Sequence, residues 1–247
     1  MIPKIIHYIW FGGRPLPELA IKCIESWKRY MPEYEIRCWD ESNFDVNIVP
    51  YTREAADAKK WAFVRDYARF WILYHYGGVY FDTDVELVKP MDDIIGNGAY
   101  MGIECGNSEK GISINPGLGM AIEPRRKLIM DILEIYDKMH FNVELIGTGK
   151  IKTIVHYTTE YLYAKGLENK NELQCVDNIL IYPNTYFCPP LLNMKILPET
   201  HSIHHYDGSW NTPFSRFKTK FYRDVVLSNH FLSSIYVYLR NCSIWRK

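Results

Sequence analysis

The chain has 247 residues, long enough for one sizeable α/β domain or for one domain with a small appendage. Its formal net charge is zero, which argues against a nucleic-acid binder that works by bulk electrostatics, and its hydrophobic content of 47% argues against disorder. The six cysteines show no CxxC spacing and predict thiols of a reducing compartment rather than a zinc site or disulfide framework. No stretch approaches the roughly 18 apolar residues of a membrane span, and the first residues lack a signal-peptide pattern, so we expect a cytoplasmic protein.

In chain order, apolar runs with the period of strands and of helices alternate. Strands are expected at 4–11, 34–39, 78–88, 99–105, 112–123 and 173–183, and helices at 16–32, 53–76, 124–140 and 147–166. A strand, a helix and a strand at the start are typical of a parallel α/β sheet. The sequence shows no repeat, and its last part is basic and aromatic. We therefore predict one folded domain at 1–215 and a helical C-terminal segment at 216–247.

The run "YHYGGVYFDTDVELV" at 74–88 places two carboxylates in an otherwise apolar stretch. If the run is a strand, Asp82 and Asp84 face the same side, and two adjacent oxygen ligands suit Mg²⁺ or Mn²⁺. A bare Asp-x-Asp is more often a pair of solvated acids. On the preceding helix, Asp66 and Arg69 share a face at i, i+3, a spacing that equally fits a surface ion pair. Only the combination of these residues favours a site.

A second polar motif, "SIHHYDGSW", lies far downstream at 202–210. His204 or His205 offers a nitrogen ligand for a metal. Ser209 offers a hydroxyl group and Trp210 an indole N–H, and both groups can bond phosphate oxygens. Alone, this motif is only suggestive.

Three motifs occur in a familiar order: "IPKIIHYIWFGG", "VRDYARFWILYHYGGVYFDTDVE" and "IHHYDGSW". Over roughly residues 1–215 the chain resembles glycosyltransferase family 32, which includes bacterial capsular-polysaccharide transferases and yeast outer-chain mannosyltransferases. The central block, Asp-x-x-Arg followed by Gly-Gly-x-Tyr-x-Asp-x-Asp, is highly specific in combination. This combination argues against the interpretation of Asp82 and Asp84 as a pair of merely solvated acids.

The resemblance implies a GT-A fold, a Rossmann-like α/β domain with a mostly parallel central sheet flanked by helices. Such a fold would bind a nucleotide-diphospho-sugar at the carboxyl ends of its strands. His7 and Trp10 would lie against the nucleoside. Asp66 and Arg69 would hold the donor sugar and its phosphate side.

The same resemblance implies a metal site and a diphosphate site. Asp82 would contact ribose or sugar and, together with Asp84, the metal ion, which would be Mn²⁺ or Mg²⁺. A related His-x-x-Gly motif selects His205 as the third metal ligand, with His204 as the alternative. The residues given catalytic roles are Asp66, Arg69, Asp82 and Asp84. Ser209 and Trp210 would bond the diphosphate.

The implied activity is metal-dependent transfer of a hexose to a glycan or lipid-linked glycan in surface polysaccharide synthesis. A UDP-sugar is the favoured donor, and GDP-mannose also fits. The resemblance points to retention of configuration, with the leaving phosphate taking the acceptor's proton, so that no general base is named. The 216–247 segment predicts peripheral contact with an anionic membrane surface, against a terminal helix packed on its own domain.

Two other classes of function share these residues. A nucleotide-sugar phosphohydrolase would use the same aspartates with water as the acceptor. A non-catalytic module would bind a nucleotide-sugar or glycan without turnover, although the intact set of Asp66, Arg69, Asp82 and Asp84 speaks against loss of activity.

Overall fold

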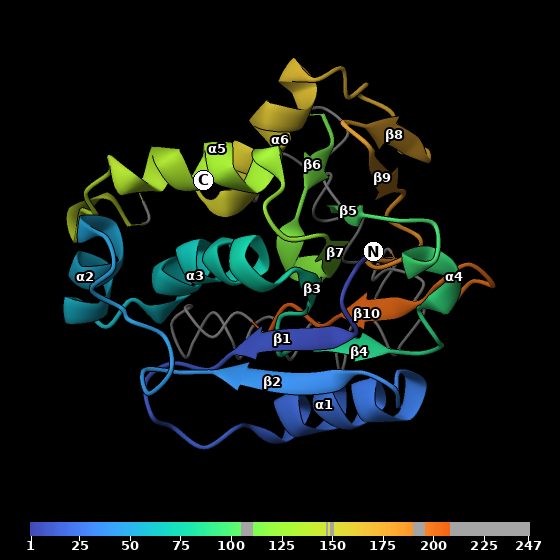
Figure 1. Ribbon diagram of the computed structural model, residues 1–247, viewed down its shortest axis with the longest axis horizontal. Coiled ribbons are helices and arrows are strands. Elements are labelled where there is room, and N and C mark those ends of the chain that lie inside the picture. The colour runs from blue at the N-terminus through green and yellow to red at the C-terminus, as the bar shows by residue number, and fades with distance from the viewer. Residues whose placement is uncertain (105–110, 147, 149–150, 190–195, 208–247) are drawn as a thin grey trace, which may run out of the picture.

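A computed structural model describes residues 1–104, 111–146, 148, 151–189 and 196–207, and the structural statements below concern these residues. Ser209, Trp210 and the predicted segment 216–247 lie outside the described residues. The arrangement of the described elements is shown in Figure 1.

A mixed sheet forms the centre of the fold, with the strand order β2-β1-β3-β7-β5-β9-β8 and β6 paired to β5. The strands are β1 (Ile5–Ile9), β2 (Glu35–Trp39), β3 (Gly78–Tyr80), β5 (Tyr100–Glu104), β6 (Ser113–Ile114), β7 (Met120–Ile122), β8 (Gln174–Val176) and β9 (Ile179–Tyr182). The pairings make β2, β1, β3, β5 and β9 run in one direction, with β7 and β8 opposed. The predicted α/β class with a mostly parallel sheet is confirmed.

Helices cover both faces of this sheet. The helices are α1 (Glu18–Tyr30), α2 (Pro50–Asp57), α3 (Trp61–Tyr76), α4 (Asp92–Ile95), α5 (Lys127–Asp137) and α6 (Ile154–Ala164), with 3-10 turns at Pro116–Leu118 and Val143–Leu145. In Figure 1, α1 lies on one side of β1 and β2, and α3 lies on the other.

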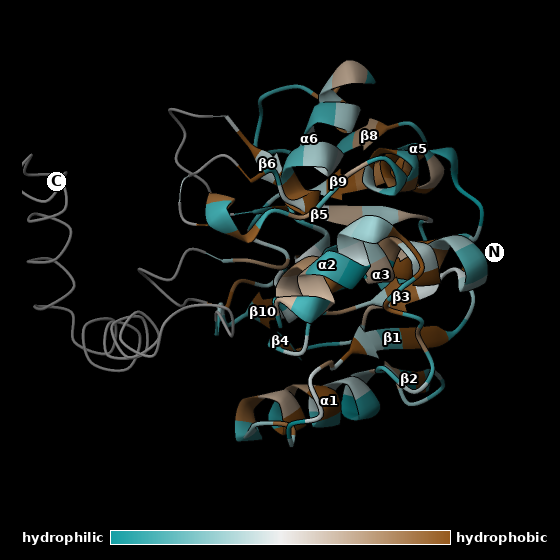
Figure 2. Ribbon diagram, turned by 90° about the vertical axis from the view of Figure 1, so that its left-hand side faces the viewer, coloured by the Kyte–Doolittle hydropathy of each residue, from teal (hydrophilic) through white to brown (hydrophobic). Residues whose placement is uncertain are grey.

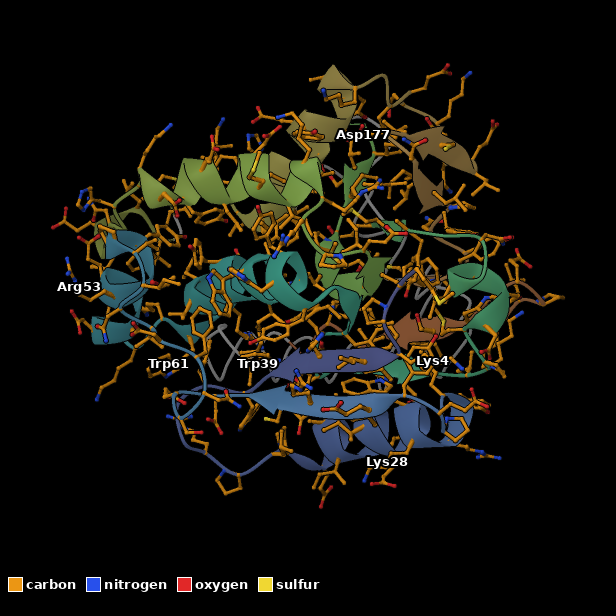
Figure 3. The ribbon with its side chains drawn as sticks, in the orientation of Figure 1. Lys4, Lys28, Trp39, Arg53, Trp61 and Asp177 are labelled. Carbon is orange, nitrogen blue, oxygen red and sulfur yellow. The ribbon has the colours of Figure 1, made fainter. Side chains whose placement is uncertain are left out.

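The alternation of side chains along β1 explains these two layers. Ile6 and Tyr8 belong to a hydrophobic cluster with Trp27 of α1, whereas Ile9 belongs to a second cluster with α2, α3, α5 and α6. Figure 2 shows the hydrophobic character of β1 and β3 inside the fold. Figure 3 shows Trp39 in the interior and charged side chains such as Arg53 at the periphery.

Several predicted elements are divided in the structure. The helix expected at 53–76 is two helices, because Lys59 adopts a left-handed φ of 55° that ends α2. The strand expected at 173–183 is a hairpin whose turn, Asp177-Asn178, has φ values of 53° and 56°. Two consecutive left-handed residues are the geometry of a tight hairpin turn. The 112–123 run comprises β6, a 3-10 turn and β7.

The most consequential difference concerns the run 78–88. It comprises β3, a turn, and β4 (Val85–Leu87), so the prediction that Asp82 and Asp84 lie on a strand is wrong. The Val85 N–H donates to the carbonyl of Asp82 at 3.0 Å and closes the turn. β4 then pairs antiparallel with β10 (Ser202–His204), a strand that the sequence did not predict.

Two further findings bear on the compartment and membrane predictions. None of the helices in the described ranges is long and apolar enough to cross a membrane. Four of the cysteines lie in these ranges, namely Cys23, Cys38, Cys175 and Cys188, and no disulfide joins any two of them.

Candidate active site

The turn after β3 and the end of β10 bring three possible metal ligands together. Asp82, Asp84 and His204 each offer one ligand atom, and these atoms all lie within 4.8 Å of one another. The β4–β10 register pairs His204 with Val85, so its imidazole lies beside the preceding aspartate, with Nε2 3.2 Å from Asp84 Oδ1. Two carboxylates and an imidazole form a donor set that suits Mn²⁺.

His205, the first choice of the sequence prediction, has a different neighbour. Its Nε2 lies 2.8 Å from Glu86 Oε2, an oxygen that is also 2.9 Å from Nζ of Lys22 on α1. Successive side chains of an extended chain point to opposite sides, so only one of the two histidines can face the aspartates. The structure brings the alternative, His204, to the aspartates.

Residues 205–207 hold Asp84 through the backbone. The His205 N–H donates to the carbonyl of Asp84 at 2.9 Å, and the Asp207 N–H donates to Asp84 Oδ2 at 2.9 Å. Between them, Tyr206 has a left-handed φ of 50°, which is uncommon for a bulky residue. Its ring contacts the His204 ring at 4.1 Å, so this turn fixes both the carboxylate and the imidazole.

Asp84 and His204 strongly perturb each other. Burial alone would lower the pKa of the His204 imidazole, but the Asp84 carboxylate outweighs burial and raises this pKa to about 9. Burial alone would raise the pKa of the Asp84 carboxyl, but His204 and the Asp207 amide hold it below its ordinary range. His204 Nδ1 is buried and has no hydrogen-bond partner among the described residues. A metal ion would take the place of the imidazole proton, since a ligating nitrogen must be deprotonated.

Arg69 joins the two predicted halves of the motif. Its Nη2 lies 3.3 Å from Asp66 Oδ1 and 3.4 Å from Asp82 Oδ1. The Tyr80 hydroxyl donates to the same Asp82 oxygen at 2.8 Å. The i, i+3 pair is therefore no surface ion pair, because the Arg69 side chain is only 6% exposed. Arg69 and Tyr80 together hold the Asp82 carboxylate in position.

Gly117 was not predicted but is required beside this pair. A β-carbon at position 117 would overlap Asp82 Oδ2 and lie 3.1 Å from Arg69 Nη1. The 3-10 turn that carries Gly117 is held by Asn115, whose side chain accepts the Gly117 N–H at 2.7 Å. The sequence signal was the "NPG" turn.

Asp66 also connects the site to α6. Its Oδ2 accepts the N–H of Ile154, the first residue of α6, at 3.3 Å. Burial is the main cause that raises the pKa of the Asp66 carboxyl to about 6, partly offset by Arg69 and by the Ile154 amide.

A pocket opens over the turn, between β1, α1, α3 and β10. Its described lining consists of Trp10, Pro17, Leu19, Ala20, Arg65, Asp82, Thr83, Asp84, His204 and Asp207. The lining combines apolar side chains with charged ones. Trp10 was predicted here, whereas Arg65, Thr83 and Asp207 were missed although each neighbours a predicted residue or motif. Asp66 and Arg69 do not belong to this described lining. Arg69 contacts Asp82 of the lining, and Asp66 contacts Arg69.

His7, predicted to lie against the nucleoside, belongs instead to the core. It is 0% exposed, its Nε2 lies 3.0 Å from the carbonyl of Gly77, and its Nδ1 accepts the Trp39 indole N–H at 3.1 Å. Burial lowers the pKa of its imidazole to about 4. His7 thus joins β1 to neighbouring elements, and the structure does not bring it into the pocket.

Comparison with known proteins shows what this chain resembles. Residues 17–100 match the glycosyltransferase sugar-binding region containing a DXD motif. Inositol phosphoceramide mannosyltransferase 1 of Schizosaccharomyces pombe is 28% identical in an alignment of length 116, which covers 40% of this chain and 33% of that protein. An uncharacterised glycosyltransferase of Acanthamoeba polyphaga mimivirus is 34% identical in an alignment of length 106, which covers 40% of this chain and 42% of that protein. The solved PaToxG glycosyltransferase superposes with a TM-score of 0.48 at 18% identity, over 67% of this chain and 70% of that one.

The chain therefore covers well under half of the length of these curated relatives, 33% and 42%. Residues 17–100 match the sugar-binding region of the DXD-containing glycosyltransferases, and the resemblance predicted from the sequence is confirmed. Asp66, Arg69, Asp82 and Asp84 all lie inside the matched region. His204 reaches the site from outside it.

Proposed function

We propose that the protein transfers a hexose from a nucleotide-diphospho-sugar to a hydroxyl of a glycan or lipid-linked acceptor, using a divalent metal ion. The convergence of Asp82, Asp84 and His204 beside a half-apolar pocket carries this proposal. The match to the sugar-binding region supports it. A relative named a mannosyltransferase favours a hexose, and the inositol phosphoceramide in that name favours a lipid-borne acceptor.

The residues of the site would divide the work. Asp82, Asp84 and His204 would hold Mn²⁺ or Mg²⁺, which stabilises charge on the leaving diphosphate when bound. Arg69 and Tyr80 hold Asp82 in place.

Trp10 would lie against the nucleoside, and Ser209 and Trp210 would donate hydrogen bonds to the diphosphate. Asp66 and Arg69 would orient the donor sugar, with Asp66 accepting a hydroxyl hydrogen. The leaving phosphate would take the acceptor's proton in a front-face reaction with retention.

A matched pair of variants tests the metal site. Asp84→Asn removes the carboxylate beside His204. Asp93→Asn is the control, because it also removes a carboxylate that lies beside a histidine, at 2.9 Å from Nε2 of His201. Neither Asp93 nor His201 belongs to the described pocket lining. Thermal-shift measurements with UDP, GDP and their hexose conjugates, with and without Mn²⁺, report native-state binding without a known acceptor.

We expect a Mn²⁺-dependent shift for the wild type and Asp93→Asn, and none for Asp84→Asn. A donor identified in this way is then incubated with and without candidate acceptors, and the released nucleotide and sugar products are identified. Transfer releases the nucleoside diphosphate and joins the sugar to an acceptor, whereas release of the nucleoside monophosphate and a sugar phosphate, unchanged by any acceptor, would favour the phosphohydrolase. Binding without release would favour the non-catalytic module. A Mn²⁺-dependent shift retained in Asp84→Asn would contradict the proposed metal site.

We also propose that the protein works on the cytoplasmic face of a membrane in surface or capsular polysaccharide synthesis. Its support is the composition of 216–247, in which basic residues flank aromatic and apolar ones. A chain ending at Tyr222 should no longer float with vesicles rich in anionic lipid, whereas the full chain should. Equal flotation of both folded proteins would exclude this role for the segment.

A further inference from the structure

Arg65 is the one lysine or arginine among the described residues that line the pocket. It lies in the first half of α3 and is only 8% exposed. Asp82, Thr83 and Asp84 line the same pocket from the β3–β4 turn. The central Asp-x-x-Arg block begins one residue later, at Asp66, and none of the predicted roles fell to Arg65.

Arg65 lies among charged neighbours. Arg65 and Arg69 are one turn apart on the same face of α3, with Arg69 Nε 3.4 Å from the carbonyl of Arg65, and like charges at this spacing destabilise a helix. Burial of a guanidinium adds a desolvation cost. The carboxylates of Asp66 and Asp84 lie close enough to Arg65 to offset part of this cost, and a diphosphate in the pocket would add a further anionic partner.

Arg69 is poorly placed to recognise an anionic ligand. Its guanidinium is directed to Asp66 and Asp82 at 3.3 Å and 3.4 Å, and it does not belong to the described pocket lining. The predicted contact between Arg69 and the phosphate side of the donor therefore passes more naturally to Arg65.

We propose that Arg65 binds the diphosphate of the nucleotide donor in the pocket that Trp10, Pro17 and Leu19 line with apolar side chains. The inference rests on the proposed function and adds to it a residue that binds phosphate. The pocket lining combines apolar side chains, which suit a flat base, with charged ones, which suit phosphates. The planar guanidinium can donate two parallel hydrogen bonds to a phosphate, a geometry that lysine lacks.

Calorimetric titration of three variants tests this assignment. Arg65→Gln removes the charge, and Arg65→Lys keeps the charge but loses the planar guanidinium that donates two parallel hydrogen bonds. Arg53→Gln removes an exposed arginine from α2 and is the control. Each protein is titrated with Mn²⁺ alone, then at saturating Mn²⁺ with UDP, GDP, uridine and guanosine. The unfolding temperature of each variant without ligand shows whether it is folded.

For Arg65→Gln we expect diphosphate binding to weaken on the order of 10- to 100-fold, as for a lost hydrogen bond to a charged group. Nucleoside binding should change by less than about twofold, because it lacks the phosphates that Arg65 contacts. Mn²⁺ binding alone should not weaken, since a cation is removed from beside its ligands. Arg65→Lys should be intermediate, and Arg53→Gln should behave as the wild type.

Unchanged diphosphate affinity in Arg65→Gln would overturn the assignment. So would an equal loss for nucleoside and diphosphate, or an equal loss of Mn²⁺ affinity, because Arg65 would then serve the pocket or the carboxylates. A wild type that binds neither diphosphate would overturn this inference and the proposed function together. The expected binding pattern without sugar transfer would contradict the proposed function alone, and transfer with unchanged binding would contradict the role of Arg65 alone.

Discussion

Asp66 is a carboxylate that the fold holds at a cost, and Asp66→Asn should reveal that cost. Burial raises the pKa of Asp66 from 3.8 to about 6. Because the pKa is higher in the folded than in the unfolded protein, this group favours folding fully below about pH 3.8 and loses that contribution as the pH rises through about 6. The difference corresponds to about 3 kcal/mol of lost stability at neutral pH.

Asparagine keeps the shape of the side chain but removes its charge. It can satisfy either the Arg69 guanidinium or the Ile154 N–H but not both, which costs about 1 kcal/mol at any pH. Between pH 4.5 and 7.5 the stability of Asp66→Asn relative to the wild type should therefore rise by about 2 kcal/mol. Urea unfolding followed by circular dichroism at these two pH values measures the change. Asp57→Asn, at the exposed end of α2, controls for the loss of one charge.

The outcome separates two explanations of the buried carboxylate. A pH-independent difference between Asp66→Asn and the wild type would refute the elevated pKa and the cost derived from it. The expected rise, together with lost nucleotide-sugar turnover, would mean that Asp66 is kept for its chemistry and against the stability of the fold.

Four further substitutions test the site and its surroundings. His204→Ala should weaken Mn²⁺ binding by at least about 100-fold, more than the change of an outer-shell residue, and His205→Ala by less than about tenfold in the same titration. Gly117→Ala should displace the Asp82 carboxylate and weaken Mn²⁺ binding on the order of 10- to 100-fold, and wild-type affinity would contradict the close contact. His7→Phe should lower the free energy of unfolding by about 2–4 kcal/mol because it leaves two buried partners unsatisfied, with an unchanged nucleotide Kd; a weakened Kd would return His7 to the binding site.

Local patterns in the sequence predicted the α/β layers well because each apolar run is continuous in the chain. The Asp82–Asp84 pair was predicted as a metal site on a strand, and the structure brings the two residues together with His204 but on a turn. A strand would have aligned the two carboxylates by its pleat, whereas the protein aligns them in a turn that ends one sheet and starts another. The apolar run conceals this break, since the residues on both sides have strand propensity.

The choice between His204 and His205 depends on the β4–β10 register, which joins residues more than a hundred positions apart. A one-residue slip would exchange the two side chains, and no local pattern fixes that register. His7 illustrates the same limit. Its partner Trp39 lies on the neighbouring strand β2, so its place in the core follows from strand pairing and was invisible in the N-terminal motif.

Features that oppose folding gather at one end of the sheet. The ionised Asp66 is costly, Arg65 lies beside Arg69 on one helix face, and Tyr206 has a left-handed backbone. All three surround the turn that follows β3, at the carboxyl end where α/β sheets bind their ligands. Concentrated strain and buried charge of this kind persist where function requires them. The physical arrangement therefore supports the same candidate active site independently of the family resemblance. It favours His204 over His205 as a metal ligand and adds Arg65 to the candidate residues.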